Sequence, residues 1–268
     1  MGLAENYIRI NKELWNNRTD FHLKSDFYDL DGFLNGRSSL NAIELQLLGD
    51  VRGKSMLHLQ CHFGQDSISL ARLGANVTGV DLSDKAIDQA RELSKKCGVN
   101  IEFINCDIYE LPNFLNKKFD IVFTSYGTIG WLPDLNTWAQ IVSRFLKPNG
   151  KFVFVEFHPI VWMFDDDFTK VAYNYLNTGP IIETQKGTYA DKNADIDQEY
   201  ISWNHGISEV ANSLIQNNLE IRSLGEYDYS PYNCFNKTIE FEPHKYRIEH
   251  LGNKIPMVYS MLCTKKSG

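Results

Sequence analysis

A strand, a tight turn, a helix and a second strand follow one another between Leu57 and Asp81. The apolar run that begins at Leu57 enters a turn at Gln60, a helix follows Gly64, and a second apolar run ends in the carboxylate of Asp81. Such a turn brings backbone N–H groups to a ligand at the N-terminus of the helix. Asp81 follows Gln60 by 21 residues, a spacing at which an acid can bind both hydroxyls of a ribose. This segment therefore predicts a nucleotide-binding βαβ unit.

The turn itself indicates which nucleotide is disfavoured. A dinucleotide site needs repeated glycines so that the backbone can approach the pyrophosphate, and Gln60 and His62 fill two of those three positions. Only Gly64 remains. Side chains at these positions would crowd a diphosphate, but they need not crowd a ligand that places an amino-acid tail there.

The string LHLQCHFG resembles the first motif of the class I S-adenosylmethionine (SAM)-dependent methyltransferases, of the methyltransferase domain 11/25 type, where LDLGCGTG is usual. In this comparison His58 replaces an acid, and Gln60 and His62 replace glycines. A second segment, FDIVFTSYGTIGWLPDL, also resembles the family. The resemblance implies SAM as the cofactor, S-adenosylhomocysteine as its product, and an α/β fold with a doubly wound, mostly parallel seven-stranded sheet whose last strand is antiparallel.

Composition narrows the class of protein. The chain has 268 residues, with 27 basic and 34 acidic side chains and a formal net charge of −7, which disfavours a surface that follows nucleic-acid phosphates. The five cysteines are scattered and form no C-x-x-C pair, as expected in a reducing compartment. No apolar stretch reaches membrane-spanning length. We expect a cytoplasmic protein, monomeric or homodimeric, that acts on a small molecule and not on nucleic acid or a membrane.

The hydrophobic pattern divides a single domain into parts. Residues 1–54 are predicted to form a helical cap, with helices over 4–16 and after Ser39; residues 55–158 form the SAM-binding core, 159–202 a lid insertion, and 203–268 the remainder of the core. In the core, Ser83 is the predicted N-cap of a helix, another helix follows Asp134, and residues 147–150 end it. Strands are predicted at 56–60, 77–81, 101–105, 120–124, 151–156, 220–227 and 257–264, and a helix at 208–216.

In a doubly wound sheet, ligands bind beyond the carboxyl ends of the strands. The resemblance assigns Asp81 to the ribose, Leu82 to the adenine face, Asp107 to the exocyclic amine of adenine and the backbone of Ile108 to a ring nitrogen. Tyr126 and Trp131 could form an aromatic wall beside the cationic sulfonium. The predicted cofactor-binding residues are Gln60, Cys61, His62, Phe63, Gly64, Asp81, Leu82, Ser83, Cys106, Asp107, Ile108, Ser125, Tyr126 and Gly127.

Methyl transfer needs a general base only if the acceptor still carries its proton when it is attacked. His158, directly after the fifth strand, is the first candidate, and Glu156, His205 and His22 are the others. No metal-binding spacing occurs in the sequence. The aromatic residues Trp162, Tyr189, Trp203, Tyr229 and Tyr232 indicate a partly apolar or aromatic acceptor.

Two other functions remain open at this point. A nicotinamide-dependent oxidoreductase would need the glycines that Gln60 and His62 replace. A noncatalytic protein that keeps the nucleotide-binding fold is compatible with those replacements.

Overall fold

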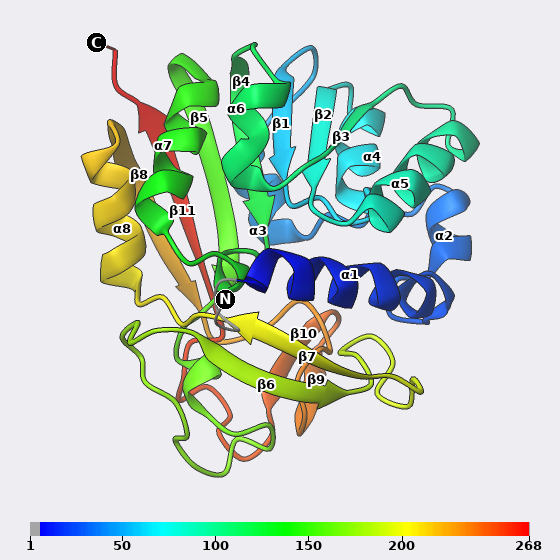
Figure 1. Ribbon diagram of the computed structural model, residues 1–268, viewed down its shortest axis with the longest axis vertical. Coiled ribbons are helices and arrows are strands. Elements are labelled where there is room, and N and C mark those ends of the chain that lie inside the picture. The colour runs from blue at the N-terminus through cyan, green and yellow to red at the C-terminus, as the bar shows by residue number, and fades with distance from the viewer. Residues whose placement is uncertain (1–5, 268) are drawn as a thin grey trace.

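The computed structural model describes residues 6–267, which are built around a seven-stranded sheet (Figure 1). The strand order is β3-β2-β1-β4-β5-β11-β8. β1 is parallel to β2 and β4, whereas β11 is antiparallel to both β5 and β8. The predicted α/β fold with an antiparallel last strand is confirmed. The strands are β1 (Ser55–Leu59), β2 (Asn76–Asp81), β3 (Glu102–Asn105), β4 (Phe119–Ser125), β5 (Leu146–Phe157), β8 (Leu219–Tyr227) and β11 (Val258–Lys265).

The strand order changes direction at β1. β2 and β3 extend the sheet on one side of it, and β4 and β5 extend it on the other. The connections that leave the carboxyl ends of β1 and β4 therefore diverge to opposite sides. This divergence opens a crevice at the carboxyl edge of the sheet, which is where α/β proteins bind nucleotides.

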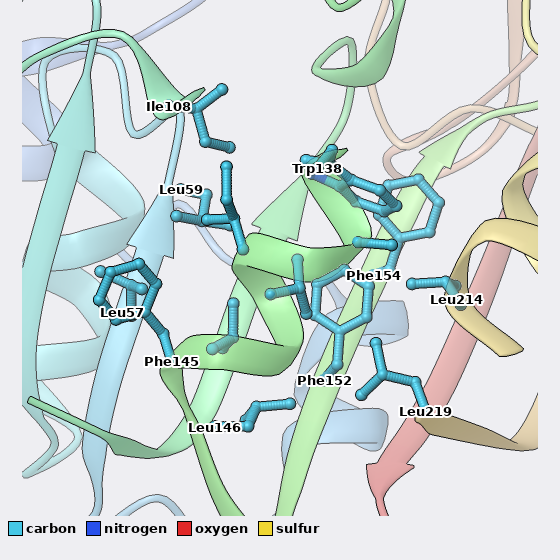
Figure 2. Close-up of a cluster of buried hydrophobic side chains, with 14 of the residues drawn as sticks. Leu57, Leu59, Ile108, Trp138, Phe145, Leu146, Phe152, Phe154, Leu214 and Leu219 are labelled. Atoms are coloured by element: carbon cyan, nitrogen blue, oxygen red, sulfur yellow. The ribbon is translucent and has the colours of Figure 1, made fainter. Parts of the chain in front are cut away.

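Alternate residues of the central strands point to opposite faces, and helices cover both. On one face Leu57 and Phe152 pack with Trp138 beneath α7 (Leu135–Phe145) and α8 (Ile207–Gln216) (Figure 2). All of these core side chains are fully buried. Burying side chains of this size stabilises the fold by about 1.5–3 kcal/mol each.

The opposite face is covered by α3 (Ala42–Leu48), which follows Ser39 as predicted, and by α4 (Gln65–Arg72). Met56, Phe123 and Val153 point to this side, and each is adjacent in sequence to a residue whose side chain packs on the first face. Because both faces are buried, the strands are continuous apolar runs in the sequence.

Side-chain caps define where two core helices begin. The Ser83 hydroxyl accepts the Ala86 N–H at 3.0 Å, so α5 (Asp84–Lys96) begins where the sequence predicts. The Asp134 carboxylate accepts backbone N–H groups in the same way at the start of α7. β5 begins directly after α7, so it is longer than the predicted strand at 151–156. The predicted turn at 147–150 lies within β5, where Asn149 has a left-handed backbone (φ 61°).

The N-terminal segment crosses the carboxyl edge of the sheet. α1 (Tyr7–Lys24) extends beyond the predicted 4–16, of which Ala4 and Glu5 lie outside the described residues. The Asn11 amide donates to the Ile201 carbonyl at 2.8 Å and accepts the Ile201 N–H at 3.0 Å. This buried pair of hydrogen bonds joins α1 to β7.

Two hairpins and several short helices complete the structure. β6 (Ile181–Lys186) and β7 (Asp197–Ser202) pair antiparallel within the predicted insertion and lie beside α1 (Figure 1). The β9–β10 hairpin was not predicted. The further elements are β9 (Thr238–Glu242), β10 (Lys245–Ile248), α2 (Leu30–Leu34), α6 (Leu111–Phe114), η2 (Ile108–Glu110), η3 (Ile129–Trp131) and η4 (Val161–Met163). Within residues 6–267, no helix combines the length and the apolar character needed to cross a bilayer.

Candidate active site

A cavity of about 890 Å³ lies at the carboxyl edge of the sheet, and residues of α1 and of the β6–β7 hairpin contribute to its walls. The predicted residues that follow β1, β2, β3 and β4 converge on it, although they are far apart in the sequence. The predicted residues that line it are Gln60, Cys61, His62, Phe63, Gly64, Asp81, Leu82, Cys106, Asp107, Ile108, Ser125, Tyr126 and Gly127.

The β1–α4 turn keeps a glycine-like backbone despite its side chains. Gln60, His62 and Gly64 have φ values of 53°, 50° and 81°, all in the left-handed region. Such a conformation costs about 1–3 kcal/mol at a non-glycine residue. Gly64 cannot be replaced without movement, because a Cβ there would lie 2.9 Å from the Phe103 ring and 3.0 Å from the Ala90 Cβ.

Asp81 joins this turn to the start of the next helix. Its carboxylate accepts the His62 N–H at 2.8 Å and the Ser83 N–H at 2.9 Å, one on each oxygen. Burial raises the pKa of Asp81 to about 6, and the hydrogen bonds from backbone N–H groups oppose this rise. Each carboxylate oxygen can accept a further hydrogen bond from a ligand.

Ser83 was predicted to bind the cofactor, and the structure corrects this prediction. Its hydroxyl caps α5 and donates to the Asn16 Oδ1 at 2.6 Å. The side chain is fully buried and is not among the residues that line the cavity.

Asp107 lines the cavity beyond β3. Its carboxylate accepts the Tyr109 N–H at 3.0 Å and so fixes the start of η2. Burial raises the pKa of Asp107. One oxygen of this carboxylate therefore accepts a hydrogen bond from the protein. Because Asp107 lies in the cavity wall, the other oxygen is available to a ligand.

The loop after β4 is held by the buried carboxylate of Glu156. This carboxylate accepts the N–H groups of Gly127, Thr128 (2.7 Å), Ile129 (3.2 Å) and Phe157 (2.7 Å), and also the Thr128 hydroxyl at 2.9 Å. Although Glu156 reaches the cavity wall, its lone pairs are occupied, so it shapes the loop and is not available to take a proton.

His158, the first candidate for the general base, lies outside the cavity. Its Nδ1 accepts the Ile160 N–H at 3.2 Å, so its Nε2 carries the proton and donates to Glu226 at 2.9 Å. Burial lowers the pKa of His158, which favours this neutral form. The prediction that His158 is the base is wrong on position: its ring points toward β8, away from the crevice.

The other two histidines are also engaged. The His205 Nε2 donates to the Leu132 carbonyl at 2.8 Å, and its Nδ1 lies 3.0 Å from a Glu209 carboxylate oxygen. His22 is fully buried beneath His62, with 3.4 Å between the His22 Nδ1 and the His62 Nε2. Burial lowers the pKa of both His22 and His62, so both rings are neutral.

Known proteins match both the core sequence and the fold. Residues 56–150 match the family model described as a methyltransferase domain. A solved SAM-dependent methyltransferase from Clostridium acetobutylicum superposes with a TM-score of 0.58 at 17% identity, over 96% of this chain and 99% of that one. Another, from Mesorhizobium loti, gives 0.57 at 20% identity, over 87% and 100%. The chain therefore contains a methyltransferase domain over residues 56–150 and has the fold of the SAM-dependent methyltransferases.

Curated relatives match only part of the chain. The ubiquinone biosynthesis O-methyltransferase of Shewanella pealeana is 30% identical in an alignment of 132 positions that covers 48% of this chain and 56% of that protein. An uncharacterized protein of Haemophilus influenzae is 29% identical in an alignment of 176 positions that covers 59% of this chain and 69% of that protein. The chain thus spans about half the length of the named relative.

Sequence reasoning missed several charged residues that line the cavity, among them Asp66 and Arg18. Asp66 accepts the Ser125 hydroxyl at 3.2 Å, and burial beside Glu44 raises its pKa to about 7. In the sequence it is one more acid in the first turn of a helix, which is a common position for an acid. Arg18 lies past the predicted end of the first helix, so no sequence signal placed it.

Proposed function

We propose that this methyltransferase holds SAM in the crevice above β1 and β4 and transfers its methyl group to a small organic acceptor enclosed by α1 and the β6–β7 hairpin. The observation that carries this proposal is the convergence of the residues after four strands on one cavity of about 890 Å³. A cavity of that size accommodates a cofactor and a small acceptor together.

The residues present fit the cofactor at both of its ends. Asp81 is fixed by two backbone N–H groups and has lone pairs left for the ribose hydroxyls. The Gln60 Nε2 donates to the Thr128 carbonyl at 2.8 Å, which leaves its buried Oε1 without a partner in the described structure. A buried, unpaired acceptor in a cavity suits an ammonium donor such as that of the methionine end.

The bound cofactor supplies an electrophilic methyl group on a positively charged sulfur, and the protein supplies alignment and a dry environment. Trp131 donates its Nε1–H to the Gly127 carbonyl at 2.7 Å, and the Trp15 ring packs against its edge with 5.3 Å between ring centroids. These contacts fix an aromatic wall. A cation over such a wall gains about 0.5–2 kcal/mol.

Asp66 replaces His158 as the side chain that we propose for proton removal. It faces the cavity, and burial raises its pKa to about 7, which is near the range where a base works best. The Asp66 carboxylate would accept the acceptor's proton, while a bound cofactor would supply the methyl group and keep the electrons of its C–S bond.

The cofactor assignment is tested by calorimetry with S-adenosylhomocysteine and with NAD. We expect binding of the first and not of the second. Asp81→Ala should weaken S-adenosylhomocysteine binding by about 1–3 kcal/mol, because charge-assisted hydrogen bonds to the ribose are lost. Asp84→Ala, which removes a neighbouring exposed acid, is the matched control.

Unchanged affinity in Asp81→Ala would remove this residue from the site, and binding of NAD alone would overturn the proposed function. A screen for transfer of a labelled methyl group from SAM into metabolite extracts would then report the activity and the acceptor together.

A further inference from the structure

Arg18 is a buried cation without an anionic partner. Its side chain projects from α1 to the cavity and is 3% exposed. Within residues 6–267, the ion pairs made by arginines involve Arg9, Arg37, Arg91, Arg222 and Arg247, so no carboxylate of the described chain lies within 4.0 Å of the Arg18 guanidinium.

The guanidinium is also short of hydrogen bonds. Its Nη2 donates to the Gln185 Oε1 at 2.6 Å, whereas its Nε is buried without a partner in residues 6–267. The Trp15 ring lies under the guanidinium, 5.4 Å from the Arg18 Cζ to the ring centroid. The nearby titratable groups are neutral: the phenols of Tyr28, Tyr189 and Tyr200, and the imidazoles of His22 and His62.

Such an arrangement is costly in a protein that has no ligand. A guanidinium remains protonated in proteins, and taking it out of water without a counter-ion costs several kcal/mol. Arginine is almost never fully buried unless it is paired. Because the unpaired group lies in the wall of the cavity, the missing anion can come from whatever fills the cavity.

We propose that Arg18 is the receptor for a carboxylate of a ligand in this cavity. The planar guanidinium matches the two oxygens of a carboxylate, and the unpaired Nε–H belongs to that planar group of donors. The inference rests on the proposed function and deepens it, since it defines the ligand as a carboxylic acid.

The carboxylate has two possible sources, the acceptor and the amino-acid end of the cofactor. The surroundings of Arg18 favour the acceptor, because its hydrogen-bond partner Gln185 belongs to β6 and the nearby Tyr200 to β7, in the hairpin that encloses the acceptor in the proposed function. Tyr189, which lies between these strands, bonds the Tyr28 hydroxyl at 2.5 Å. These rings would hold an apolar or aromatic body beside the anion.

The test uses formate, the smallest carboxylate, and thermal unfolding of the full chain. We expect sodium formate to raise the Tm of the wild type above its value in equal sodium chloride or in neutral formamide. This protection should be lost in Arg18→Met and reduced in Arg18→Lys, which keeps the charge but not the planar fork. Arg9→Met, which removes an exposed arginine from the same helix, should keep it.

The protein without added anion gives a second readout. Removal of an unpaired buried charge should raise the Tm of Arg18→Met by about 2–4 °C, whereas loss of a structural arginine would lower it. A lower Tm would count against the proposal. Formate protection that is absent from the wild type, or equal in the wild type and Arg18→Met, would overturn it.

Saturation with S-adenosylhomocysteine distinguishes the two sources. If the acceptor supplies the carboxylate, formate still protects the saturated wild type, and Arg18→Met binds S-adenosylhomocysteine with unchanged affinity. If the cofactor supplies it, saturation abolishes formate protection, and Arg18→Met loses at least about tenfold in affinity for S-adenosylhomocysteine but not for 5′-methylthioadenosine, which has no carboxylate. Failure of the wild type to bind S-adenosylhomocysteine would instead refute the proposed function and leave the formate result to decide on Arg18.

Discussion

The carboxyl group of Asp66 at the cavity lies near a second carboxyl group, that of Glu44, whose environment differs. Glu44 is fully buried and accepts the Asn41 backbone N–H, the Asn41 amide and the Tyr126 hydroxyl. Asp66 has the Ser125 hydroxyl at 3.2 Å and faces the cavity. Glu44 is therefore held in place by the protein, whereas Asp66 is the one of the pair that can exchange a proton with a ligand.

The raised pKa of Asp66 predicts a pH-dependent loss of stability. Its pKa is about 7 in the folded protein, against about 3.9 for an ordinary aspartate. Between these values the folded state keeps a proton that the unfolded state has lost. The stabilising contribution is therefore complete below pH 4 and disappears as the pH rises through about 7.

Asp66→Asn removes this titration, because an amide does not ionise. From pH 5 to pH 8, we expect the free energy of unfolding of the wild type to fall by about 1–3 kcal/mol relative to that of Asp66→Asn. Urea unfolding at the two pH values measures this difference. Asp88→Asn, at an exposed acid on α5, serves as the control. A parallel pH dependence in wild type and Asp66→Asn would mean that Asp66 titrates normally.

At the scale of elements, the parallel strands were predictable because helices bury both of their faces. Each strand is then a continuous apolar run, and every strand exit is a place where a ligand can contact the chain. The full length of α1 was not predictable in this way. Beyond Leu14, its buried residues are the polar Arg18, Thr19 and His22, which leave no apolar stripe in the sequence.

The β9–β10 hairpin was not predicted because, unlike the central strands of the seven-stranded sheet, it buries neither face completely. The residues of β9 are exposed or half-buried, so burial imposes no alternation on its sequence. At the site, strand order predicted which loops converge, but it could not show which way a side chain points. That limitation explains both His158, which turns toward β8, and Ser83, which turns into its own helix.

The corrected role of Ser83 gives a prediction for α5. Ser83→Ala should lower the free energy of unfolding by about 1 kcal/mol, because the Ala86 N–H loses its cap. Affinity for S-adenosylhomocysteine should stay the same. Chemical denaturation and calorimetry measure the two quantities. A large loss of affinity at unchanged stability would return Ser83 to the binding site.

At the scale of the whole molecule, the parts that surround the cavity are fastened to one another. The reciprocal hydrogen bonds between Asn11 and Ile201 join α1 to β7. Arg18 joins the same helix to β6 through Gln185. Tyr28, just beyond α1, bonds Tyr189 between the two strands. Three successive ties therefore connect the N-terminal segment to the hairpin.

Asn11→Ala should loosen both parts at once. The Ile201 N–H and carbonyl would be left buried without partners, at a cost of about 1–3 kcal/mol. We expect faster amide hydrogen exchange in residues 7–24 and in residues 197–202, with core strands β1 and β4 unchanged. Glu13→Ala, at an exposed position of α1, should leave both regions as in the wild type. Faster exchange in one region alone would show that the two are not coupled.

The hydrogen bonds between Asn11 and Ile201 have a consequence for the order in which ligands enter and leave the cavity. Because hydrogen bonds join α1 to both strands of the β6–β7 hairpin, we expect the helix and the hairpin to move together relative to the ends of the sheet strands. The opening for ligands would then lie between this unit and the strand ends. The methyl donor and the methyl acceptor would then enter the cavity through the same opening. The molecule that binds deeper in the cavity would have to bind first, and its product would be released last.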